Sequence, residues 1–376
     1  MHGQGQHKQA WKTNWVFIFL LLSFLNYTVF RYSFSGEPIN PALTQISEVF
    51  RGLFILIYLP NLTTHSRFTR HLFSQFICFF IFALGGLVAS LTWAGAKSGF
   101  YAIWAFVLIY SVFASSKEQI HQASWRMIYI TLSFLMLGLV NGQPFEIAFS
   151  SKVFWPAFLV ILFANVASDS NRPNNRRLSL LLTVSLLFIL LSGKRFALVL
   201  FASLVASEAS FLLVFLVLGG LVLWVGADKL TADNFETIYR LQKLEITNGQ
   251  LTEVGSSQSL ADRSWIYQSY LHLWQEFPLG LGLGASSDLH TKIYADSYLA
   301  GYSPHNSFLA ALIETGILGG LAYATAFVLA LAQTLYRKKR ILFFLVLMGQ
   351  MFIEYNSSPG QILFLPILMF LALLYK

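Results

Sequence analysis

Long uninterrupted runs of apolar residues recur along most of this chain, with short polar stretches between them. The runs are about 15 to 25 residues long, the length a helix needs to cross a hydrocarbon core of roughly 30 Å. They are continuous and do not alternate between apolar and polar positions, so the pattern indicates helices and not the strands of a closed barrel. We therefore expect an all-α membrane protein that crosses the bilayer many times.

The apolar pattern predicts about twelve transmembrane helices. The first run has no small-residue cleavage site after it and is followed by further runs, so we interpret it as a span and not as a removed signal peptide. Three short spans are expected to share residues 178–226. The twelve spans are expected near residues 14–30, 46–60, 73–94, 99–115, 125–141, 153–168, 178–192, 194–206, 210–226, 307–335, 340–355 and 361–375.

The composition agrees with this pattern, since 56% of residues are hydrophobic and 11% are charged, against about 25% charged in soluble domains. The formal net charge is +8. In a soluble protein this charge would suggest a nucleic-acid partner, but in a membrane protein the excess of Lys and Arg in cytoplasmic loops explains it. We expect membrane lipids and no nucleic acid among the partners.

Lys and Arg are distributed unevenly over alternate loops. If the N-terminus is cytoplasmic, the short outer loops hold only Arg31, Lys97, Lys152, Lys194 and Arg195, so both termini are predicted to be cytoplasmic. The fourteen inner cations are Lys8, Lys12, Arg67, Arg70, Lys117, Arg126, Arg172, Arg176, Arg177, Arg337, Lys338, Lys339, Arg340 and Lys376.

The chain divides into three parts by this reasoning: transmembrane helices one to nine in residues 1–226, one large outer loop in 227–304, and helices ten to twelve in 305–376. The loop carries nine of the seventeen acidic residues. Long loops on a rigid scaffold are common places for function. Cys78 is the single cysteine. It cannot form an internal disulfide, and no metal-ligand spacing surrounds it.

The stretch "SPHNSFLAALIETGILGG" at 303–320 passes from polar loop to apolar helix. Ser303 is a suitable N-cap and Pro304 a favoured first helical residue, which would place His305 and Asn306 in the first turn. The helix dipole there favours a neutral imidazole, as a general base requires, and also attracts phosphate. A capping or interfacial histidine is an equally weighted alternative. Glu314 is expected to be a structural hydrogen-bonding group between helices.

Upstream, "LADRSWIYQSYLHLWQEFPLGLGLG" predicts an amphipathic helix and then a flexible glycine turn. An apolar stripe at helical spacing suits a helix that lies on the membrane interface. Arg263 falls on that same stripe, where a buried arginine needs an anionic partner such as a ligand. The alternative interpretation is that its side chain extends to the lipid headgroups. The stripe consists of Ile266, Tyr270, Leu273, Trp274 and Phe277.

Lys194 and Arg195 lie in a tight outer turn, where positive charge is disfavoured. A phosphate ligand would explain them, and a short loop that tolerates two charges is the alternative. Topology places Arg195, Arg263 and His305 together at the outer interface. Two cations and a neutral base suit transfer from a lipid diphosphate. Because no carboxylate cluster with metal-ligand spacing accompanies them, we expect a metal-independent reaction without a cofactor.

These motifs resemble the O-antigen ligase and O-antigen polymerase family of bacteria. "SPHNSFLAALIETGILGG" is similar to its His-Asn-x-x-Leu…Glu-x-Gly…Gly signature, and "DRSWIYQSYLHLWQEFPLGLGLG" to its Arg…aromatic…Pro-Leu-Gly-x-Gly segment. "LSGKRFALVLFA" resembles its Ser-Arg helix start, with two residues inserted between the usually adjacent Ser and Arg. The resemblance covers roughly residues 178–335.

The resemblance implies a multi-pass glycosyltransferase of the bacterial inner membrane with its active site on the periplasmic side. The donor would be a glycan linked to undecaprenyl diphosphate, and the acceptor either lipid A-core in a ligase or a second lipid-linked glycan in a polymerase. His305 would be the catalytic base, Arg195 and Arg263 would bind the diphosphate, and Asn306 and Lys194 would support them.

Alternatives from other classes predict different charge patterns. A flippase or transporter of lipid-linked oligosaccharide should carry charges along a path at bilayer depth and show repeat symmetry, whereas the unusual charges here gather at one surface. A scaffold protein would leave Arg195 and Arg263 unexplained. Between ligase and polymerase the sequence favours ligase only weakly.

Overall fold

The computed structural model describes residues 14–25, 41–58, 69–91, 95–140, 154–167, 175–191, 195–208, 244–247, 250–253, 256–295, 297, 302–337, 340–353, 361 and 363–376. These residues are helical apart from turns and one two-stranded antiparallel hairpin. The helices are α1 (Trp15–Leu25), α2 (Pro41–Tyr58), α3 (Arg70–Ala89), α4 (Gly95–Ala114), α5 (Lys117–Val140), α6 (Phe154–Ala167), α7 (Asn175–Leu191), α8 (Arg195–Glu208), α11 (Ser256–Glu276), α12 (Ser286–Ile293), α13 (Ser307–Arg337), α14 (Ile341–Ile353) and α15 (Phe364–Leu373); the strands are β1 (Leu244–Thr247) and β2 (Gln250–Glu253).

Eleven of the twelve expected spans coincide with a helix, and the ninth, 210–226, lies outside the described residues. Within the described ranges, α3, α4 and α13 are long and apolar enough to cross a membrane, and five other apolar helices are shorter. The hydrophobic helical class is therefore confirmed, and the total of twelve spans stays a prediction.

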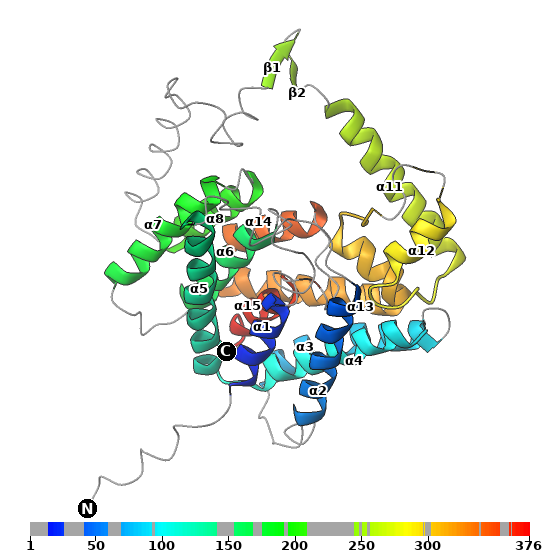
Figure 1. The fold of residues 1–376 in the computed structure, drawn as a ribbon, viewed down its shortest axis with the longest axis horizontal. Coiled ribbons are helices and arrows are strands. Elements are labelled where there is room, and N and C mark those ends of the chain that lie inside the picture. The colour runs from blue at the N-terminus through cyan, green and yellow to red at the C-terminus, as the bar shows by residue number, and fades with distance from the viewer. Residues whose placement is uncertain are drawn as a thin grey trace, which may run out of the picture.

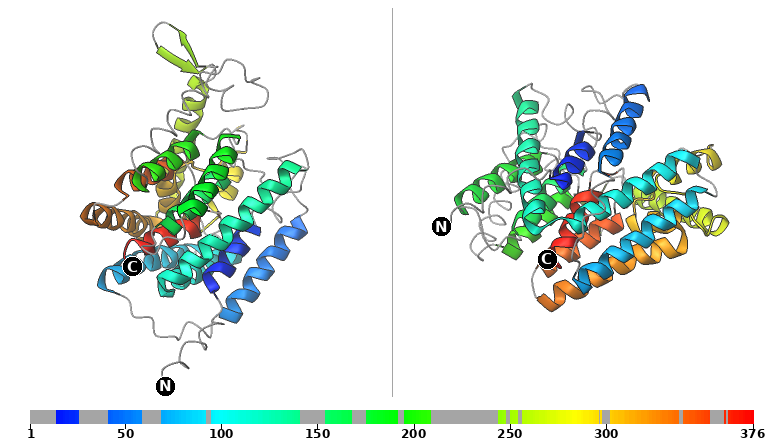
Figure 2. Two further views of the ribbon diagram at one scale, coloured as in Figure 1. Left: turned by 90° about the vertical axis from the view of Figure 1, so that its left-hand side faces the viewer. Right: turned by 90° about the horizontal axis from the view of Figure 1, so that it is seen from below.

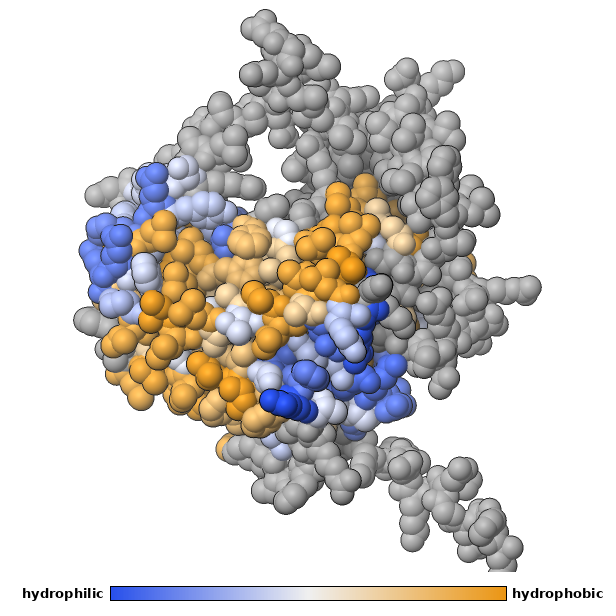
Figure 3. All heavy atoms as spheres, turned by 180° about the vertical axis from the view of Figure 1, so that it is seen from behind, coloured by the Kyte–Doolittle hydropathy of each residue, from blue (hydrophilic) through white to orange (hydrophobic). Residues whose placement is uncertain are grey.

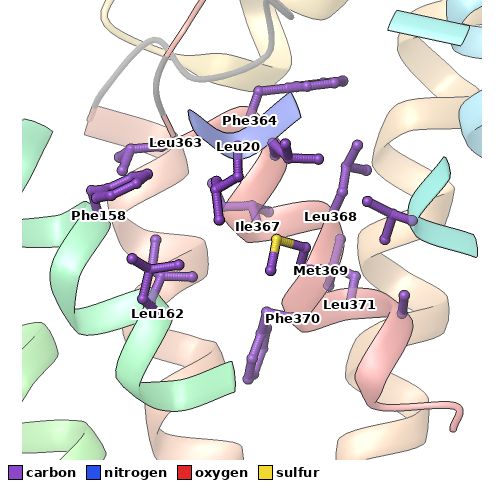
Figure 4. Close-up of a cluster of buried hydrophobic side chains, with 14 of the residues drawn as sticks. Leu20, Phe158, Leu162, Leu363, Phe364, Ile367, Leu368, Met369, Phe370 and Leu371 are labelled. Carbon is purple, nitrogen blue, oxygen red and sulfur yellow. The ribbon is translucent and has the colours of Figure 1, made fainter. Parts of the chain in front are cut away.

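The C-terminal helix α15 is the centre of the main hydrophobic core. Every residue from Phe364 to Leu373 is buried, as expected for a helix that is apolar on all sides. Figure 4 shows its side chains meeting Leu20 of α1 and both Phe158 and Leu162 of α6. Helices from the first, middle and last parts of the chain therefore share one core.

Helices α3 and α13 pack side by side over most of their length (Figure 2). Gly85 of α3 allows this approach, because a Cβ atom there would lie 2.6 Å from the Thr315 carbonyl oxygen, and a Cβ atom on Gly86 would lie 2.7 Å from Leu283 in the segment before α12. Farther along, Gln75 Nε2 donates to the carbonyl of Ala326 at 2.7 Å.

Helix α13 is broken at Gly316, where φ is 70° and ψ is −177°. The expected tenth span, 307–335, is therefore not one straight helix. At the bend, a Cβ atom on Gly320 would lie 2.6 Å from Cα of Leu312 in the same helix. The break leaves a short first half, 307–315, and a longer second half, 317–337.

Polar contacts hold helix ends together at both ends of α4. At one end, Asn14 Nδ2 donates to the Gln119 carbonyl at 2.8 Å, Lys376 Nζ donates to the carbonyls of Val112 and Ser115, and Arg340 donates to Ala164 at 2.9 Å. At the other end, Lys97 Nζ lies 3.6 Å from the carboxylate of Asp288, and Ser98 Oγ donates to Leu283 at 2.7 Å. The compartment that each end faces stays a prediction.

The outer surface of the helix group is strongly apolar. Figure 3 shows a broad apolar area on one face with hydrophilic residues at its edges. Exposed apolar side chains include Leu84 and Leu91 of α3 and Leu318, Leu321 and Val328 of α13. In a soluble protein such an area would be an interaction surface, and on helices of this composition it is suited to contact with lipid.

A buried arginine on α2 escaped the sequence analysis. Arg51 is 2% exposed, and its guanidinium carbon lies 5.7 Å from the ring centre of Trp104 in α4. On the same helix, Glu48 accepts a hydrogen bond from the Tyr101 hydroxyl at 3.3 Å. A cation enclosed in a membrane protein requires compensation, and the ring face supplies part of it through a cation–π contact.

A second, smaller core lies beside the main group, where α11 and α12 meet the first half of α13 (Figure 1). Its buried centre consists of Ile266, Tyr270, Leu273, Leu281 and Ile313. Three of these belong to the stripe that was expected to lie on the membrane interface. That expectation is wrong for them, because they are buried inside the protein against α13.

Candidate functional site

His305 lies in a turn before α13 and not in its first helical turn. The helix begins at Ser307, and Asn306 is its N-cap, because Asn306 Oδ1 accepts hydrogen bonds from the backbone N–H of Phe308 and of Leu309, both at 3.0 Å. The expected cap at Ser303 is wrong. Both residues are good caps, and Asn306 takes the role because it directly precedes the continuous helical run.

The cap also changes the expected phosphate site. The free N–H groups of a first turn attract anions, but two of them here point at the Asn306 side-chain oxygen. The helix end therefore does not offer these groups to a diphosphate. Any phosphate bound near His305 must rely on side-chain cations, and Asn306 contributes chiefly by fixing where the turn ends and the helix starts.

The backbone of His305 is in the left-handed region, with φ of 44°. Residues other than glycine adopt this region rarely, at a cost of about 1–2 kcal/mol. Such strain persists only where surrounding structure holds it, and it is frequent at active sites. The imidazole is partly exposed, so the strained turn presents it at the surface.

Two tyrosines of α11 hold this turn. The Tyr270 hydroxyl donates to the Tyr302 carbonyl at 2.8 Å, and the Tyr267 hydroxyl lies 3.4 Å from the His305 carbonyl and 3.5 Å from that of Phe352. The first contact is a strong hydrogen bond and the other two are long. Tyr270, expected to face lipid, instead contacts the segment that carries the histidine.

Arg263 lies on the same helix face as these tyrosines. It is one turn before Tyr267 and two turns before Tyr270, and residues at these spacings share one side of a helix. Helix α11 therefore brings the segment that carries Arg263 against the turn that carries His305, across 42 positions of sequence. The side chain of Arg263 lies outside the described residues.

The placement of Arg195 is described only for its backbone. Arg195 is the first residue of α8, which packs along α14. The C-terminal end of α14 reaches the candidate site, where the ring of Phe352 lies 4.7 Å from that of Phe308. Lys194 and the Arg195 side chain lie outside the described residues, so their expected roles stay predictions.

The glycine segment after α11 is docked, and the expectation of a flexible turn is wrong. Leu281 N–H donates to the Ile313 carbonyl and Gly282 N–H to that of Glu314, both at 2.8 Å. A Cβ atom on Gly280 would lie 2.5 Å from the Gly316 nitrogen. The break in α13 leaves these carbonyls available, and the segment 278–284 satisfies them.

Buried polar groups continue behind this segment. Glu314 is fully buried and its Oε1 accepts a hydrogen bond from Ser286 Oγ at 2.7 Å, which confirms the expected structural role between helices. Burial, and then the nearby Glu314 charge, raise the pKa of Tyr270 far above its usual value. His290 is also fully buried, and its Nε2 atom lies 2.9 Å from Ser269 Oγ. Burial lowers the pKa of His290.

Sequence reasoning missed Tyr267, Ser286 and His290. The Arg263–Tyr267–Tyr270 spacing on one helix face was the available signal for the first. The others depend on contacts between separate helices. Among the residues that the structure describes, no group of three or more His, Cys, Asp or Glu side chains could hold a metal ion.

Comparison with known proteins agrees with the motifs. A family model described as O-antigen ligase matches residues 156–324, from α6 into the second half of α13. No individual curated protein matches the chain. The matched range contains Arg195, Arg263 and His305. Members of this family are glycosyltransferase-like enzymes of surface polysaccharide biosynthesis that use lipid-linked glycans. Over residues 156–324, this chain is therefore similar to the O-antigen ligase family.

Proposed function

We propose that this protein transfers a glycan from undecaprenyl diphosphate to a hydroxyl of lipid A-core, at the periplasmic face of the bacterial inner membrane and with both termini in the cytoplasm. One observation carries the proposal: α11 bears Arg263 on the face from which Tyr267 and Tyr270 contact the His305 turn. In this proposal, a cation and a base from distant segments act on the same substrate. The family match supports the general reaction class.

In this reaction His305 takes the proton of the acceptor hydroxyl. The acceptor oxygen then forms a bond to the anomeric carbon, while the bond from that carbon to the diphosphate oxygen breaks. The leaving diphosphate gains negative charge, which Arg263 and Arg195 would neutralise through paired N–H donors. Lys194 would add a further positive charge. Asn306 would hold the base in place by capping α13.

The proposed chemistry needs no metal ion. In many phosphate sites a divalent cation neutralises the leaving group, and here two arginines and a lysine would supply that charge. Transfer in membranes treated with a chelator should therefore equal transfer in untreated membranes. A chelator-sensitive reaction that added Mg²⁺ restores would contradict this part of the proposal.

The test replaces His305 in a strain that lacks the native gene. The variants are His305→Ala, and His305→Asn, which tolerates a positive φ and keeps the turn while removing the base. His272→Ala, an exposed histidine on α11, is the matched control. Membrane expression is confirmed for each variant, and surface polysaccharide and lipid-linked glycan are then separated on gels.

We expect both His305 variants to abolish long chains on the acceptor and His272→Ala to leave them unchanged. The loss should be at least about a hundredfold, within the usual contribution of general-base catalysis. Lipid-linked polymer that accumulates would identify a ligase, whereas single repeat units on the core would identify a polymerase. Long chains at normal levels in both His305 variants would disprove the catalytic role and favour a transporter.

A further inference from the structure

His305 lies in a short segment that is held at both ends. After it, the Asn306 side chain accepts two backbone N–H groups of α13, both at 3.0 Å, which fixes where the helix begins. Before it, the Tyr302 carbonyl accepts the Tyr270 hydroxyl at 2.8 Å. Only residues 303–305 lie between these two anchors, and among them Pro304 is buried and has its φ restricted by its ring.

The two anchors hold a backbone conformation that is unfavourable by itself. His305 has a φ of 44°, in the left-handed region that residues with a side chain rarely adopt. Such strain persists only where the surrounding structure determines it. The free energy of one hydrogen bond is comparable to the cost of one left-handed residue. Without the anchor at Tyr302, relaxed turns that place the imidazole elsewhere would therefore compete with the observed one.

Tyr270 is itself held firmly by the smaller core. Its side chain is fully buried, and its ring stacks on His290 with centres 4.6 Å apart and planes 14° apart. His290 is in turn fixed by the contact of its Nε2 with Ser269 Oγ at 2.9 Å. The packing of the ring thus sets the place from which the hydroxyl donates to the turn. The Tyr267 contact with the His305 carbonyl is longer, at 3.4 Å, and comes from a half-buried side chain.

We propose that Tyr270 is a positioning residue for the transfer reaction. Its hydroxyl holds the Tyr302 carbonyl and thereby keeps the backbone of His305 in the conformation that presents the base to the acceptor hydroxyl. Tyr270 does not touch the substrate, because its side chain is fully buried. The inference rests on the proposed function, since it takes His305 as the base.

The experiment compares Tyr270→Phe with Tyr294→Phe, because each change removes one hydroxyl and keeps the ring. Tyr294 packs against the same His290 ring, with centres 4.9 Å apart, but its hydroxyl contacts the Ser269 carbonyl, at 3.4 Å. Initial rates are measured as the consumption of lipid-linked glycan in membrane vesicles from the strain that lacks the native gene and expresses each variant. This measure counts transfer to either kind of acceptor.

We expect Tyr270→Phe to lower the rate at least about tenfold, because small misplacements of a catalytic group have large effects. Tyr294→Phe should stay within about twofold of the wild type. The dissociation constant of farnesyl diphosphate, measured by calorimetry on the purified full-length protein, should also change by less than about twofold in Tyr270→Phe, since the arginines proposed to bind the diphosphate are unchanged.

A double variant tests whether the effect passes through His305. His305→Asn already lacks the base, so adding Tyr270→Phe should change the residual rate by less than about twofold. Losses that multiply in the double variant would show that Tyr270 acts elsewhere and would overturn the inference.

Hydrogen exchange measures the anchor without reference to activity. Amides of residues 302–309 should exchange faster in Tyr270→Phe than in Tyr294→Phe. Equal exchange, a normal rate in Tyr270→Phe, or an equal loss of rate in both tyrosine variants would each contradict the positioning role. An active His305→Ala would refute the proposed function itself, whereas an inactive His305→Ala beside a normal Tyr270→Phe would refute only the role of Tyr270.

Discussion

At the scale of single residues, His290 shows how completely a polar side chain can be enclosed in the smaller core. Its ring stacks on Tyr270 with centres 4.6 Å apart, and Trp265 meets it edge-on at 5.7 Å. Ser269 Oγ lies 2.9 Å from its Nε2. Burial disfavours the imidazolium, which lowers the pKa of His290 in the folded protein.

A pH dependence of local stability follows from His290. The pKa in the folded protein lies below the unfolded value of about 6.5, so the unfolded state takes up the proton first as pH falls. Stability of the α11–α12 unit is complete above about pH 6.5 and is lost toward the folded pKa, by at most about 1.4 kcal/mol per pH unit. Hydrogen exchange of residues 286–293 at neutral and mildly acidic pH measures this loss.

The matched variants for this measurement are His290→Gln, which cannot titrate, and His272→Gln on the exposed face of α11. Protection in His290→Gln should change less with pH than in the wild type, and His272→Gln should behave like the wild type. Equal pH dependence in His290→Gln and wild type would contradict the assignment to His290.

The residue types of the site were predictable, but their local geometry was not. His305 and Arg263 are conspicuous in the sequence because His305 lies at the start of an apolar helix and Arg263 lies on an apolar helical stripe. Ser303 was expected to cap the helix, but Asn306, three residues later, is also a good capping residue, and only the folded backbone decides between them. Tyr270 is apolar enough to suggest a lipid contact, yet its hydroxyl binds a carbonyl 32 residues away.

At the scale of elements, the break in α13 organises the site. Carbonyls of Ile313 and Glu314 leave the helical pattern and accept N–H groups of the segment 278–284. Irregular backbone near membrane depth is tolerated where protein buries it and satisfies its polar groups. The hydropathy of 307–335 is uniform, so the apolar pattern predicted a continuous helix, and the positive φ of Gly316 could not be read from it.

Adding a methyl group to Gly280 should disrupt this docking. Its Cβ atom would lie 2.5–2.9 Å from three backbone atoms of Glu314, Thr315 and Gly316, none of which can rotate away. Gly280→Ala should therefore strongly reduce the yield of assembled protein and its melting temperature, as measured by size-exclusion chromatography and thermal unfolding of the detergent-purified protein.

Gly95→Ala is the matched comparison. Gly95 also has a positive φ, of 70°, but nothing lies within 4 Å of its Cβ position. That variant should show only the conformational cost, about 1–2 kcal/mol. If Gly280→Ala proves no more destabilising than Gly95→Ala, the close approach of the two backbones does not matter for assembly.

At the scale of the whole molecule, the separation of polar contacts into two ends predicts a topology. Lys292 of α12 is exposed near the Lys97–Asp288 ion pair, and Glu118 is exposed near the contacts of Lys376. Positive-inside reasoning places the first end in the periplasm and the second in the cytoplasm.

Cysteine labelling measures this topology. In a Cys78→Ser background, Lys292→Cys should react with a membrane-impermeant maleimide in spheroplasts, whereas Glu118→Cys should react only after the membrane is permeabilised. Unmodified Cys78→Ser protein controls for background labelling. The reverse pattern would invert the molecule and place His305 on the cytoplasmic side, which the proposed reaction does not allow.

The sequence by itself determined the membrane class and the position of eleven of the twelve expected helical segments. Hydropathy and charge bias are local properties of the chain, and the cost of exposing polar backbone to lipid makes them decisive. The tertiary structure alone decided where α13 breaks, which residue caps it, and that α11 packs on the His305 turn. These features depend on contacts between segments far apart in sequence, whose energies no local pattern contains.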